Sequence, residues 1–576
     1  MKPVRLIANL LALLGFFVCY GASAQGPNEA IKNALPGSTQ PGVIGKILAT
    51  PPQTMPTALP PISAPEEQPS PLGPEAAQIK FKLTQIVLEE NHVYSDHQLS
   101  LLYQHKLNTE ISIAELQEIV QSITNFYRNN GYILSRAILP PQRVHEGVVH
   151  IRVIEGYVDQ VSVVGIPRGA KKIIQSYGNK IAQSRPLQIK VMEHYLRLAN
   201  EIPGVQVKAV LEPSKTEVGA SNLHLSSETQ TLTGSLSYDN YGTRYIGPNQ
   251  WTAHAALNSI FRPGDSTRAI YATTTRPQEL KFYDVSYQAP IGTHGATLSV
   301  GKNDSTTRPG MDLAAIDTNG NSTTYYGSFT YPLTHSREKN LTLDGTFNYL
   351  DSQVTSFEAP LYTDHIRSLQ GGANYDFADR FRGANLVGLH VEQGLNILGA
   401  TNNPNSETTS RFGATGIFTK VVAQAMHLQP LRGRFSTFAL INGQYSFRPL
   451  LASEQFAFGG SQLGRGYDPA EIIGDRGLSG SVELRLSIAP GWFLLNSFQP
   501  YVFYDAGIIW NMKRVAGIRP KQNATSAGLG SRFVFTHHLT GNLMVAKPLT
   551  KKVAAEELVG RGKDARVFFS VVANLG

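Results

Sequence analysis

Cysteine is almost absent from this sequence of 576 residues, which contains only Cys19. That residue lies in the first 24, where basic residues precede an apolar run and the Ala-Ser-Ala sequence at 22–24 fits the pattern cut by leader peptidase. We therefore predict a secretory signal peptide over residues 1–24, with an uncleaved anchor helix as the alternative. Removal of the leader leaves a chain without a thiol, which excludes disulfides, cysteine nucleophiles and cysteine metal sites.

Charged residues are also scarce. They make up 16% of the chain, and 51 Lys and Arg against 43 Asp and Glu give a formal net charge of +8. The sequence contains no run of five or more basic residues and no zinc-finger or helix-turn-helix pattern. We therefore expect no nucleic-acid partner.

Long apolar runs are missing as well. After residue 24 no segment offers 18 consecutive apolar residues, which is about the length that a membrane-spanning helix needs. In hydrocarbon all backbone polar groups must be hydrogen-bonded, and only helices and closed barrels achieve this. If the mature chain crosses a bilayer, it must do so with strands.

The chain after the leader begins with a segment of low complexity. Residues 25–78 are rich in proline, alanine, serine and glycine and show little apolar periodicity, so we predict a linker. A short helix is expected within it only over residues 28–35, where Asn28 can cap the start and Pro36 stops the end.

Residues 79–228 alternate between strand and helix patterns. Apolar residues between Leu116 and Tyr127 recur at helical spacing, whereas the segment from Val148 to Ile154 has the pattern of a strand. A similar succession follows. We predict two α+β units, residues 79–155 and 156–228, each of which is small and typical of a binding module.

From residue 229 to residue 576 the helical period gives way to alternation. Apolar and polar residues alternate over 232–239 and again over 341–349, as in strands with one apolar and one polar face. About sixteen such segments, at roughly 22 residues per strand and loop, suit an outer-membrane barrel, with a soluble β-sandwich or propeller as the alternative. The predicted fold is thus two α+β units followed by an all-β transmembrane barrel of about 16 antiparallel strands. Candidate residues for its interfacial girdles are Trp251, Tyr325, Tyr326 and Trp510.

Enzyme motifs are absent. The sequence has no GxSxG nucleophile elbow and no Walker loop. Residues 145–150 form HExxxH, which is one residue too long for the zinc helix motif and lies in a strand context. His537 and His538 are adjacent, so on a strand they point to opposite faces. We expect no enzymatic activity, no metal and no cofactor.

The segment from Phe456 to Ser487 is the longest predicted interruption between strands. It contains six of the glycines that would permit tight folding and several charged residues, among them Arg465 and Asp475. Further along, Phe503 and Asp505 share one face of a predicted strand and Tyr504 occupies the other. If Tyr504 faces lipid, Asp505 and Phe503 face the lumen.

Three segments in the same order carry a resemblance to a known family. They are residues 129–156, the loop motif Leu463-Gly464-Arg465-Gly466-Tyr467 and the strand motif Phe503-Tyr504-Asp505-Ala506-Gly507. With them the sequence resembles the outer-membrane transporters of two-partner secretion, the TpsB proteins related to haemolysin secretion transporters, within the superfamily of POTRA-domain barrels. The resemblance covers nearly everything after the linker.

The resemblance implies roles for the motif residues. The motif loop folds back into the barrel in this family, with its arginine paired to the aspartate of the strand motif. Carried over, Arg465 is the loop-tip cation and Asp505, in the Phe503, Asp505 and Gly507 motif, is its partner on the barrel wall. The alternative is that both are solvated lumen residues. Asp475 and Arg476 are candidate secondary partners.

Three departures from the family pattern stand out. Gly464 occupies a position where many members have a larger residue. The chain ends with Leu575-Gly576 rather than with the aromatic residue that the assembly machinery reads. In relatives an N-terminal helix plugs the pore, and the only candidate here, residues 28–35, is short.

By resemblance the protein lies in the outer membrane of a Gram-negative bacterium, with its POTRA domains in the periplasm. The POTRA domains would bind the N-terminal secretion domain of a large, unfolded partner exoprotein by strand addition, and the barrel would export it. The other expected partners are outer-membrane lipid and the barrel assembly machinery. The alternatives are an assembly factor for other barrels and a passive porin.

Overall fold

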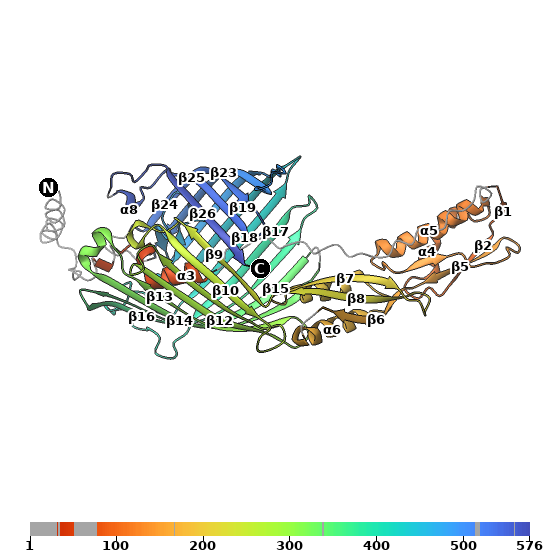
Figure 1. Cartoon of the computed structure of the whole chain (residues 1–576), viewed down its shortest axis with the longest axis horizontal. Coiled ribbons are helices and arrows are strands. Elements are labelled where there is room, and N and C mark those ends of the chain that lie inside the picture. The colour runs from red at the N-terminus through yellow and green to blue at the C-terminus, as the bar shows by residue number, and fades with distance from the viewer. Residues whose placement is uncertain are drawn as a thin grey trace.

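The computed structural model of the chain describes residues 31–32, 35–50, 78–165, 168–336, 339–512, 519–557 and 559–575. The predicted signal peptide, and most of the predicted helix over residues 28–35, lie outside these residues. Figure 1 shows two small α+β units in line with a large barrel, and a helix inside the barrel. Within the described ranges, no helix is both long enough and apolar enough to cross a bilayer.

The first unit is an α+β domain with a small mixed sheet. Strands β2 and β5 are parallel, β4 joins β5 antiparallel, and β1 pairs separately with β3. The long helix begins at a capping box made by Ser112 and Glu115, and it buries its apolar side, including Ile119 and Ile123, against the sheet. The elements are β1 (Lys80–Lys82), β2 (Gln85–Glu89), α4 (Asp96–Ser100), η3 (Gln104–Lys106), β3 (Glu110–Ser112), α5 (Ile113–Asn129), β4 (Arg136–Ile138) and β5 (Val148–Ile154).

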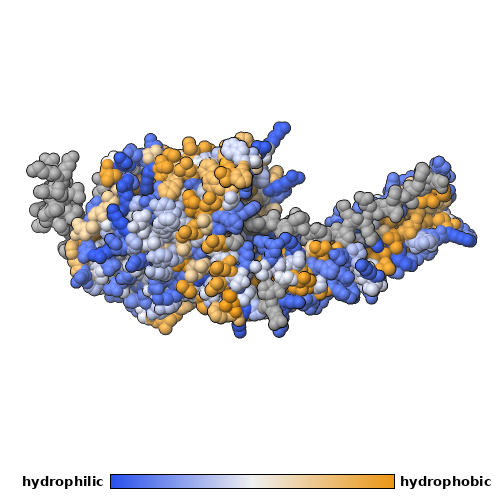
Figure 2. Space-filling model, viewed as in Figure 1, coloured by the Kyte–Doolittle hydropathy of each residue, from blue (hydrophilic) through white to orange (hydrophobic). Residues whose placement is uncertain are grey.

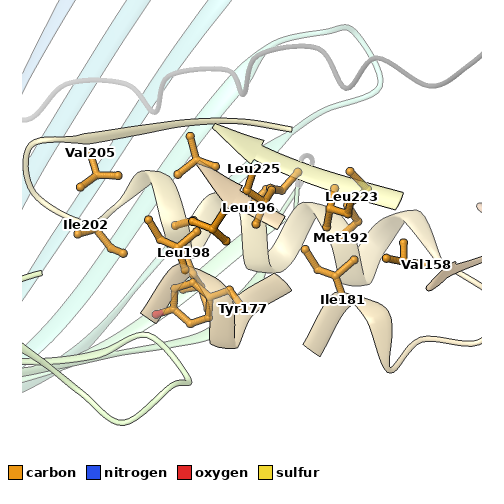
Figure 3. Packing of buried hydrophobic residues seen from close by; sticks show 14 of the residues in the cluster. Val158, Tyr177, Ile181, Met192, Leu196, Leu198, Ile202, Val205, Leu223 and Leu225 are labelled. Carbon is orange, nitrogen blue, oxygen red and sulfur yellow. The ribbon is translucent and has the colours of Figure 1, made fainter. Parts of the chain in front are cut away.

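The second unit repeats this plan with a sheet ordered β6-β8-β7. Its two helices cover one face of the sheet, and Tyr177, Met192, Leu198 and Leu223 meet in the apolar core shown in Figure 3. The elements are β6 (Tyr157–Val164), α6 (Arg168–Ala182), α7 (Ile189–Asn200), β7 (Val205–Pro213) and β8 (Ala220–Thr229).

The remainder of the chain forms a closed antiparallel barrel of 16 strands, as the alternation predicted. Each strand pairs with its neighbour in the chain, except where a long loop separates β19 from β22, and β26 closes the barrel on β9. The strands are β9 (Leu232–Asp239), β10 (Gln250–Asn258), β11 (Ser266–Thr274), β12 (Leu280–Ile291), β13 (Ala296–Thr307), β14 (Thr318–His335), β15 (Lys339–Ser356), β16 (Ala359–Ala378), β17 (Ala384–Gly394), β18 (Thr419–Pro430), β19 (Phe435–Ser446), β22 (Arg476–Leu486), β23 (Ser497–Trp510), β24 (Lys521–Val534), β25 (Leu539–Pro548) and β26 (Arg566–Leu575). Short helices lie in the connections: η4 (Arg244–Ile246), η5 (Met311–Ile316), η6 (Ala452–Glu454) and α8 (Ala554–Glu557).

The two faces of the barrel wall differ in polarity. On β22, Leu478, Val482 and Leu484 are exposed on the outside, whereas Ser481 and Glu483 are buried on the inside. Figure 2 shows apolar side chains gathered over the outer wall. This is the pattern of a wall that faces lipid outside and a polar lumen inside.

Three of the four residues predicted for the interfacial girdles are exposed: Trp251, Tyr325 and Trp510. The prediction for Tyr326 is wrong, because the side chain alternates to the inside of β14. Its hydroxyl donates a hydrogen bond to the buried carboxylate of Asp284, with 3.1 Å between the oxygens. Two adjacent tyrosines cannot both face outward on a strand.

A helix that the sequence did not reveal occupies the barrel interior (Figure 1). Residues 35–50 belong to the segment predicted to be a linker, but they form η1 (Gly37–Thr39) and α3 (Pro41–Ala49), and Val43 and Ile44 are buried. Gly42 and Gly45 lie on one side of α3. A Cβ atom at Gly42 would come within 2.9 Å of the Ser453 side chain, so glycine allows this close approach to the lumen surface. The composition that suggested a linker therefore serves packing inside the barrel.

Candidate functional site in the barrel interior

The long loop between β19 and β22 folds back into the barrel. Two short strands, β20 (Phe456–Phe458) and β21 (Ile472–Gly474), pair with each other and form the two sides of its base. The motif lies between them. The side chains of Arg465 and Tyr467 are almost completely buried, as expected for a loop that fills the lumen rather than extending into solvent.

Arg465 at the loop tip meets Asp505 on the barrel wall. The guanidinium Nη2 donates to Asp505 Oδ1 at 2.7 Å and Nε donates to Oδ2 at 3.0 Å, which is the bidentate arrangement. The backbone N–H of Arg465 also donates to Oδ2, at 2.9 Å. Asp505 and Phe503 face the lumen and Tyr504 is exposed on the other face, as the alternation predicted.

Two further wall residues on β22 complete the arginine site. Nη2 of Arg465 donates to the Ser481 hydroxyl at 2.7 Å, and Nη1 donates to the Glu483 carboxylate. The guanidinium carbon lies 3.6 Å from the centre of the Phe503 ring, so the cation is stacked on an aromatic face. Sequence reasoning missed both β22 residues. The signal was available, because Ser481 and Glu483 share the lumen face of β22, and Ser481 stands opposite Asp505 in the sheet register.

The predicted secondary partners of the arginine site are wrong. Asp475 pairs with Arg411 and accepts backbone N–H groups from Leu450 and Met512. Arg476 donates to the carbonyl of Ser446 at 2.9 Å. Both residues therefore anchor the loop base, at the point where it rejoins β22, and neither reaches the motif tip.

The arginine site belongs to a larger charge network. Glu483 also accepts hydrogen bonds from Arg485, at 2.6 Å, and from Arg532, at 3.1 Å. Three guanidinium groups thus surround two carboxylates. In a confined lumen each buried carboxylate depends on these cations, because burial of an unpaired charge is costly. The arrangement fixes the loop tip against β22 and β23.

Two glycines, one from the loop motif and one from the strand motif, lie against the same aromatic ring. A Cβ atom at Gly464 would lie 2.7 Å from the Phe458 ring, and one at Gly507 would lie 2.4 Å from it. Gly464 also has a φ of +73°, in the left-handed region that favours glycine. The departure at Gly464 from the larger residue of many family members is thus matched by Phe458 of β20, a contact that sequence reasoning did not identify.

The other motif residues fasten the loop to the C-terminal strands. The Tyr467 hydroxyl donates to the carbonyl of Thr525 at 2.9 Å and accepts from the N–H of Lys551 at 3.1 Å.

The remaining motif residues pack closely in the same region. A Cβ atom at Gly466 would lie 2.9 Å from the backbone of Pro548. Leu463 packs against the buried cluster that contains Phe458 and Tyr467. All the predicted motif residues therefore lie in one region of the lumen.

Helix α3 lies beside this loop and makes a different kind of contact. Nζ of Lys46 is 2.5 Å from Glu454, and Glu454 is also 2.6 Å from Nζ of Lys420 on the barrel wall. The carbonyl of Thr39 accepts a hydrogen bond from Thr307 of β13, at 2.9 Å. The helix therefore rests on lumen-facing groups and takes part in no strand pairing.

A second candidate site lies on the first α+β unit. A groove of about 770 Å³ runs beside β1, which pairs with β3 alone. Its lining is mostly apolar, and Ile79 and Val144 at its border are exposed. Lining residues include Phe81, Leu116, Leu139, Pro140 and Pro141. An exposed sheet edge next to an apolar groove is the geometry that accepts an added strand.

These features together define a class of protein: an outer-membrane transporter in which small periplasmic domains precede a barrel whose lumen contains an anchored loop. The chain belongs to the haemolysin secretion/activation protein family ShlB/FhaC/HecB, which matches residues 219–533, and its first unit is a POTRA domain of the ShlB type, matched over residues 81–156. Members of this family are two-partner secretion transporters of the outer membrane, with their POTRA domains in the periplasm.

Similar proteins agree with this placement. The heme/hemopexin transporter protein HuxB of Haemophilus influenzae is 24% identical over 489 residues, which cover 82% of this chain and 85% of HuxB. The outer membrane transporter CdiB of Dickeya dadantii is 22% identical over 461 residues, covering 75% of this chain and 77% of CdiB. The solved structure of CdiB from Escherichia coli covers 96% of this chain and all of CdiB with a TM-score of 0.68, at 18% identity. BamA from Haemophilus ducreyi, lacking its first three POTRA domains, shares the fold with a TM-score of 0.52 at 14% identity, over 86% of this chain and all of that one.

Proposed function

We propose that this transporter exports a large partner exoprotein, which it binds in the periplasm as an unfolded chain and passes through the barrel lumen. The observation that carries the proposal is that α3 lies inside the barrel without forming part of its wall. The helix contributes no strand to the sheet and rests on lumen-facing side chains such as Ser305 and Ser352. Its departure would free part of the lumen without breaking a strand pair.

Capture of the partner is assigned to the groove of the first POTRA domain. A strand of the partner would extend the two-stranded sheet at β1, and its apolar side chains would enter the groove beside Phe81 and Leu139. Backbone hydrogen bonds give such binding affinity without demanding one particular sequence. The partner chemistry is therefore an extended segment with alternating apolar residues, which fits the N-terminal secretion domain of an exoprotein.

The motif loop is assigned a supporting role in transport. Arg465 and the two carboxylates it contacts hold the loop tip against β22 and β23, so the loop remains on one side of the lumen while the partner passes. Folding of the partner outside the cell would make passage one-way. No nucleotide is needed in this scheme.

A secretion assay with two matched variants tests the proposal. Ile79 borders the groove and is 55% exposed, and Leu101 lies outside the groove lining and is also 55% exposed. A candidate partner exoprotein from the same genome is co-expressed, and its amount in the medium is measured. We expect Ile79→Glu to reduce export at least about tenfold, because a charge in the groove opposes burial of an apolar strand, and Leu101→Glu to leave it unchanged.

The same assay separates the alternatives. An assembly factor would leave the exoprotein inside the cell, while its deletion would deplete other barrels from the outer membrane. A passive porin would admit small solutes but release no exoprotein in any variant. Equal export by the two variants would refute the groove as the capture site and leave the exporter itself standing.

A further inference from the structure

The periplasmic turn between β22 and β23 exposes three consecutive apolar side chains. Trp492, Phe493 and Leu494 are 66%, 96% and 69% exposed. Antiparallel strands alternate ends, so this turn lies at the end of the barrel from which the POTRA domains extend. Exposed single apolar residues are ordinary, but a contiguous group at a loop tip marks an interaction surface.

The base of this turn is well fixed. Ile488 forms a bridge with Phe498, and the N–H of Ser487 donates to the carbonyl of Arg434 in the neighbouring β18–β19 turn, at 2.9 Å. On the other side, the N–H of Asn496 donates to the carbonyl of Val534 at the end of β24, also at 2.9 Å. The turn is thus tied to both adjacent hairpins, and its apolar tip is held in one place.

The tip is continuous with the lipid-facing surface of the barrel. Phe498 lies on the same side of β23 as the exposed residues Val502 and Tyr504, and it stands opposite Phe533 in the register. The ring of Phe533 is stacked on that of Phe535, with 5.8 Å between the centroids. The outer rim of this sector is therefore aromatic, as at the interface of a bilayer.

Charge near the tip also fits a phospholipid surface. The sequence contains no charged residue between Arg485 and Asp505, so nothing on the turn opposes entry into an apolar layer. The adjacent β18–β19 turn carries Arg432 and Arg434, which suit phosphate groups at the same depth. An apolar tip flanked by arginines is the pattern of a segment that lies in a membrane interface.

The second POTRA domain meets the opposite side of the barrel. Nζ of Lys180 in α6 lies 3.2 Å from Nε2 of His294 in the β12–β13 turn. A Cβ atom at Gly295 of that turn would lie 2.4 Å from the side chain of Leu198 in α7. In the order of the 16 strands, the β22–β23 turn is eight positions away from the β12–β13 turn. One side of the periplasmic rim is thus covered by protein, and the aromatic turn lies diametrically opposite.

We propose that the Trp492-Phe493-Leu494 tip inserts into the phospholipid interface of the periplasmic leaflet and anchors the side of the barrel opposite the POTRA domains. The tip binds acyl chains and glycerol groups, and the neighbouring arginines bind phosphates. The anchor is independent of the exported partner.

Tryptophan fluorescence tests this placement directly, because the chain contains only three tryptophans, Trp251, Trp492 and Trp510. The double variant Trp251→Phe/Trp510→Phe reports on Trp492 alone. It is placed as full-length protein in vesicles of phosphatidylethanolamine and phosphatidylglycerol, to which phosphatidylcholine with brominated acyl chains is added. Bromines near the headgroup should reduce the emission about twofold, more than bromines near the chain ends, and aqueous iodide should have little effect.

A water-exposed reference makes the result decisive. Val218 lies in the second POTRA domain and is 82% exposed, so Val218→Trp in a background without the native tryptophans should respond to iodide and not to bromines. If Trp492 behaves like this reference, the tip lies in the periplasm and the proposal is wrong. Iodide quenching of Trp492 that disappears when the exoprotein is added would instead identify a protein-docking tip, and would also overturn it. If the double variant fails to fold, the difference between the wild type and Trp492→Phe gives the same information.

Discussion

The barrel lumen contains two elements that are not part of its wall, the motif loop and helix α3, and they are held in opposite ways. Arg465 at the loop tip is the principal cation for Asp505 and one of three for Glu483, so its loss leaves buried charge unpaired. Lys46 of α3 contacts Glu454, but Glu454 also has Lys420 on the wall. Loss of α3 therefore leaves Glu454 paired with Lys420. In the proposed export, this difference makes the motif loop the permanent element and α3 the removable one.

The largest effect is expected from Arg465→Ala, which removes the cation that holds the loop tip. Removing one partner of a buried ion pair costs about 3–5 kcal/mol, because the other charge remains buried. We expect the barrel to insert, the loop tip to become accessible to protease, and export of the exoprotein to be abolished. Secretion and limited proteolysis in intact outer membranes measure both outcomes.

Arg476→Ala is the matched control, since Arg476 bonds a backbone carbonyl at the loop base rather than a carboxylate at the tip. It should keep most of the export. Undiminished export by Arg465→Ala would show that the loop tip needs no charge pair.

The second prediction tests whether α3 closes the lumen. Deletion of residues 41–49 should raise the conductance of the barrel in planar bilayers several-fold, because the lumen loses α3 while every strand pair stays. Lys46→Ala should act in the same direction but more weakly. Its side chain is 41% exposed, and the buried Glu454 keeps Lys420 as a partner when Lys46 is lost.

Ile47→Ala provides the control on the same helix, where the side chain is also 41% exposed but uncharged. It should leave the conductance unchanged. A closed channel after deletion of α3 would mean that the loop alone seals the lumen.

A smaller effect is expected from Gly507→Ala, which tests how tightly the loop fits the wall. The new Cβ atom would lie 2.4 Å from the Phe458 ring, and such overpacking costs about 1–3 kcal/mol. The temperature at which the folded barrel loses its heat-modifiable band shift should fall by a few degrees. Gly327→Ala, where nothing lies within 4 Å of the Cβ position, should leave it unchanged. Combining Gly507→Ala with Phe458→Leu should restore part of the loss.

The smallest effect concerns an ion pair outside the membrane, which contrasts with the buried pairs of the lumen. The Lys106 ammonium and the Ser112 backbone N–H, both bonded to Glu115, hold the pKa of that carboxyl at about 2, below its ordinary 4.5. Because the folded state has the lower pKa, this pair stabilises the first POTRA domain above pH 4.5, and the stabilisation is lost as the pH falls towards 2.

Calorimetry of the POTRA transition in the full chain measures this loss. Glu115→Gln should lower the transition temperature slightly at neutral pH and show a weaker fall in acid than the wild type. Glu110→Gln, an exposed residue on the neighbouring strand, serves as the control. An identical acid profile in Glu115→Gln would show that the pair adds nothing.

The features that can be predicted from the sequence are those that depend on the alternation of apolar and polar residues or on charged motifs. A period of two identifies a barrel strand wherever lipid lies on one side and a polar lumen on the other, which is why Asp505 and Phe503 could be assigned to the lumen. The pairing of Arg465 with Asp505 followed from family motifs rather than from spacing. The geometry now supplies its partners Ser481 and Glu483 on the adjacent strand.

The features that were missed depend on contacts between distant parts of the chain. Helix α3 has a composition typical of a linker, and its contacts lie far away in the sequence, such as that of Gly42 with Ser453, more than 400 residues away. Tyr326 sits beside Tyr325 and looks equally suited to an interface, until the strand register places it next to Asp284. Asp475 carries the charge expected of a partner for Arg465, but Arg411 from another loop reaches it instead.

Helix α3 is joined through residues 51–77 to the first POTRA domain, so in the proposed export it would stay attached to the protein on leaving the lumen. A tethered ligand experiences an effective concentration in roughly the millimolar range, whatever the abundance of free competitors. In the proposed export, the entering exoprotein would have to outcompete that local supply for as long as it occupied the pore. Once the last residues of the exoprotein had passed in the proposed export, the tethered helix would reoccupy the lumen, and each round of secretion would end with the channel closed by a segment of the transporter itself.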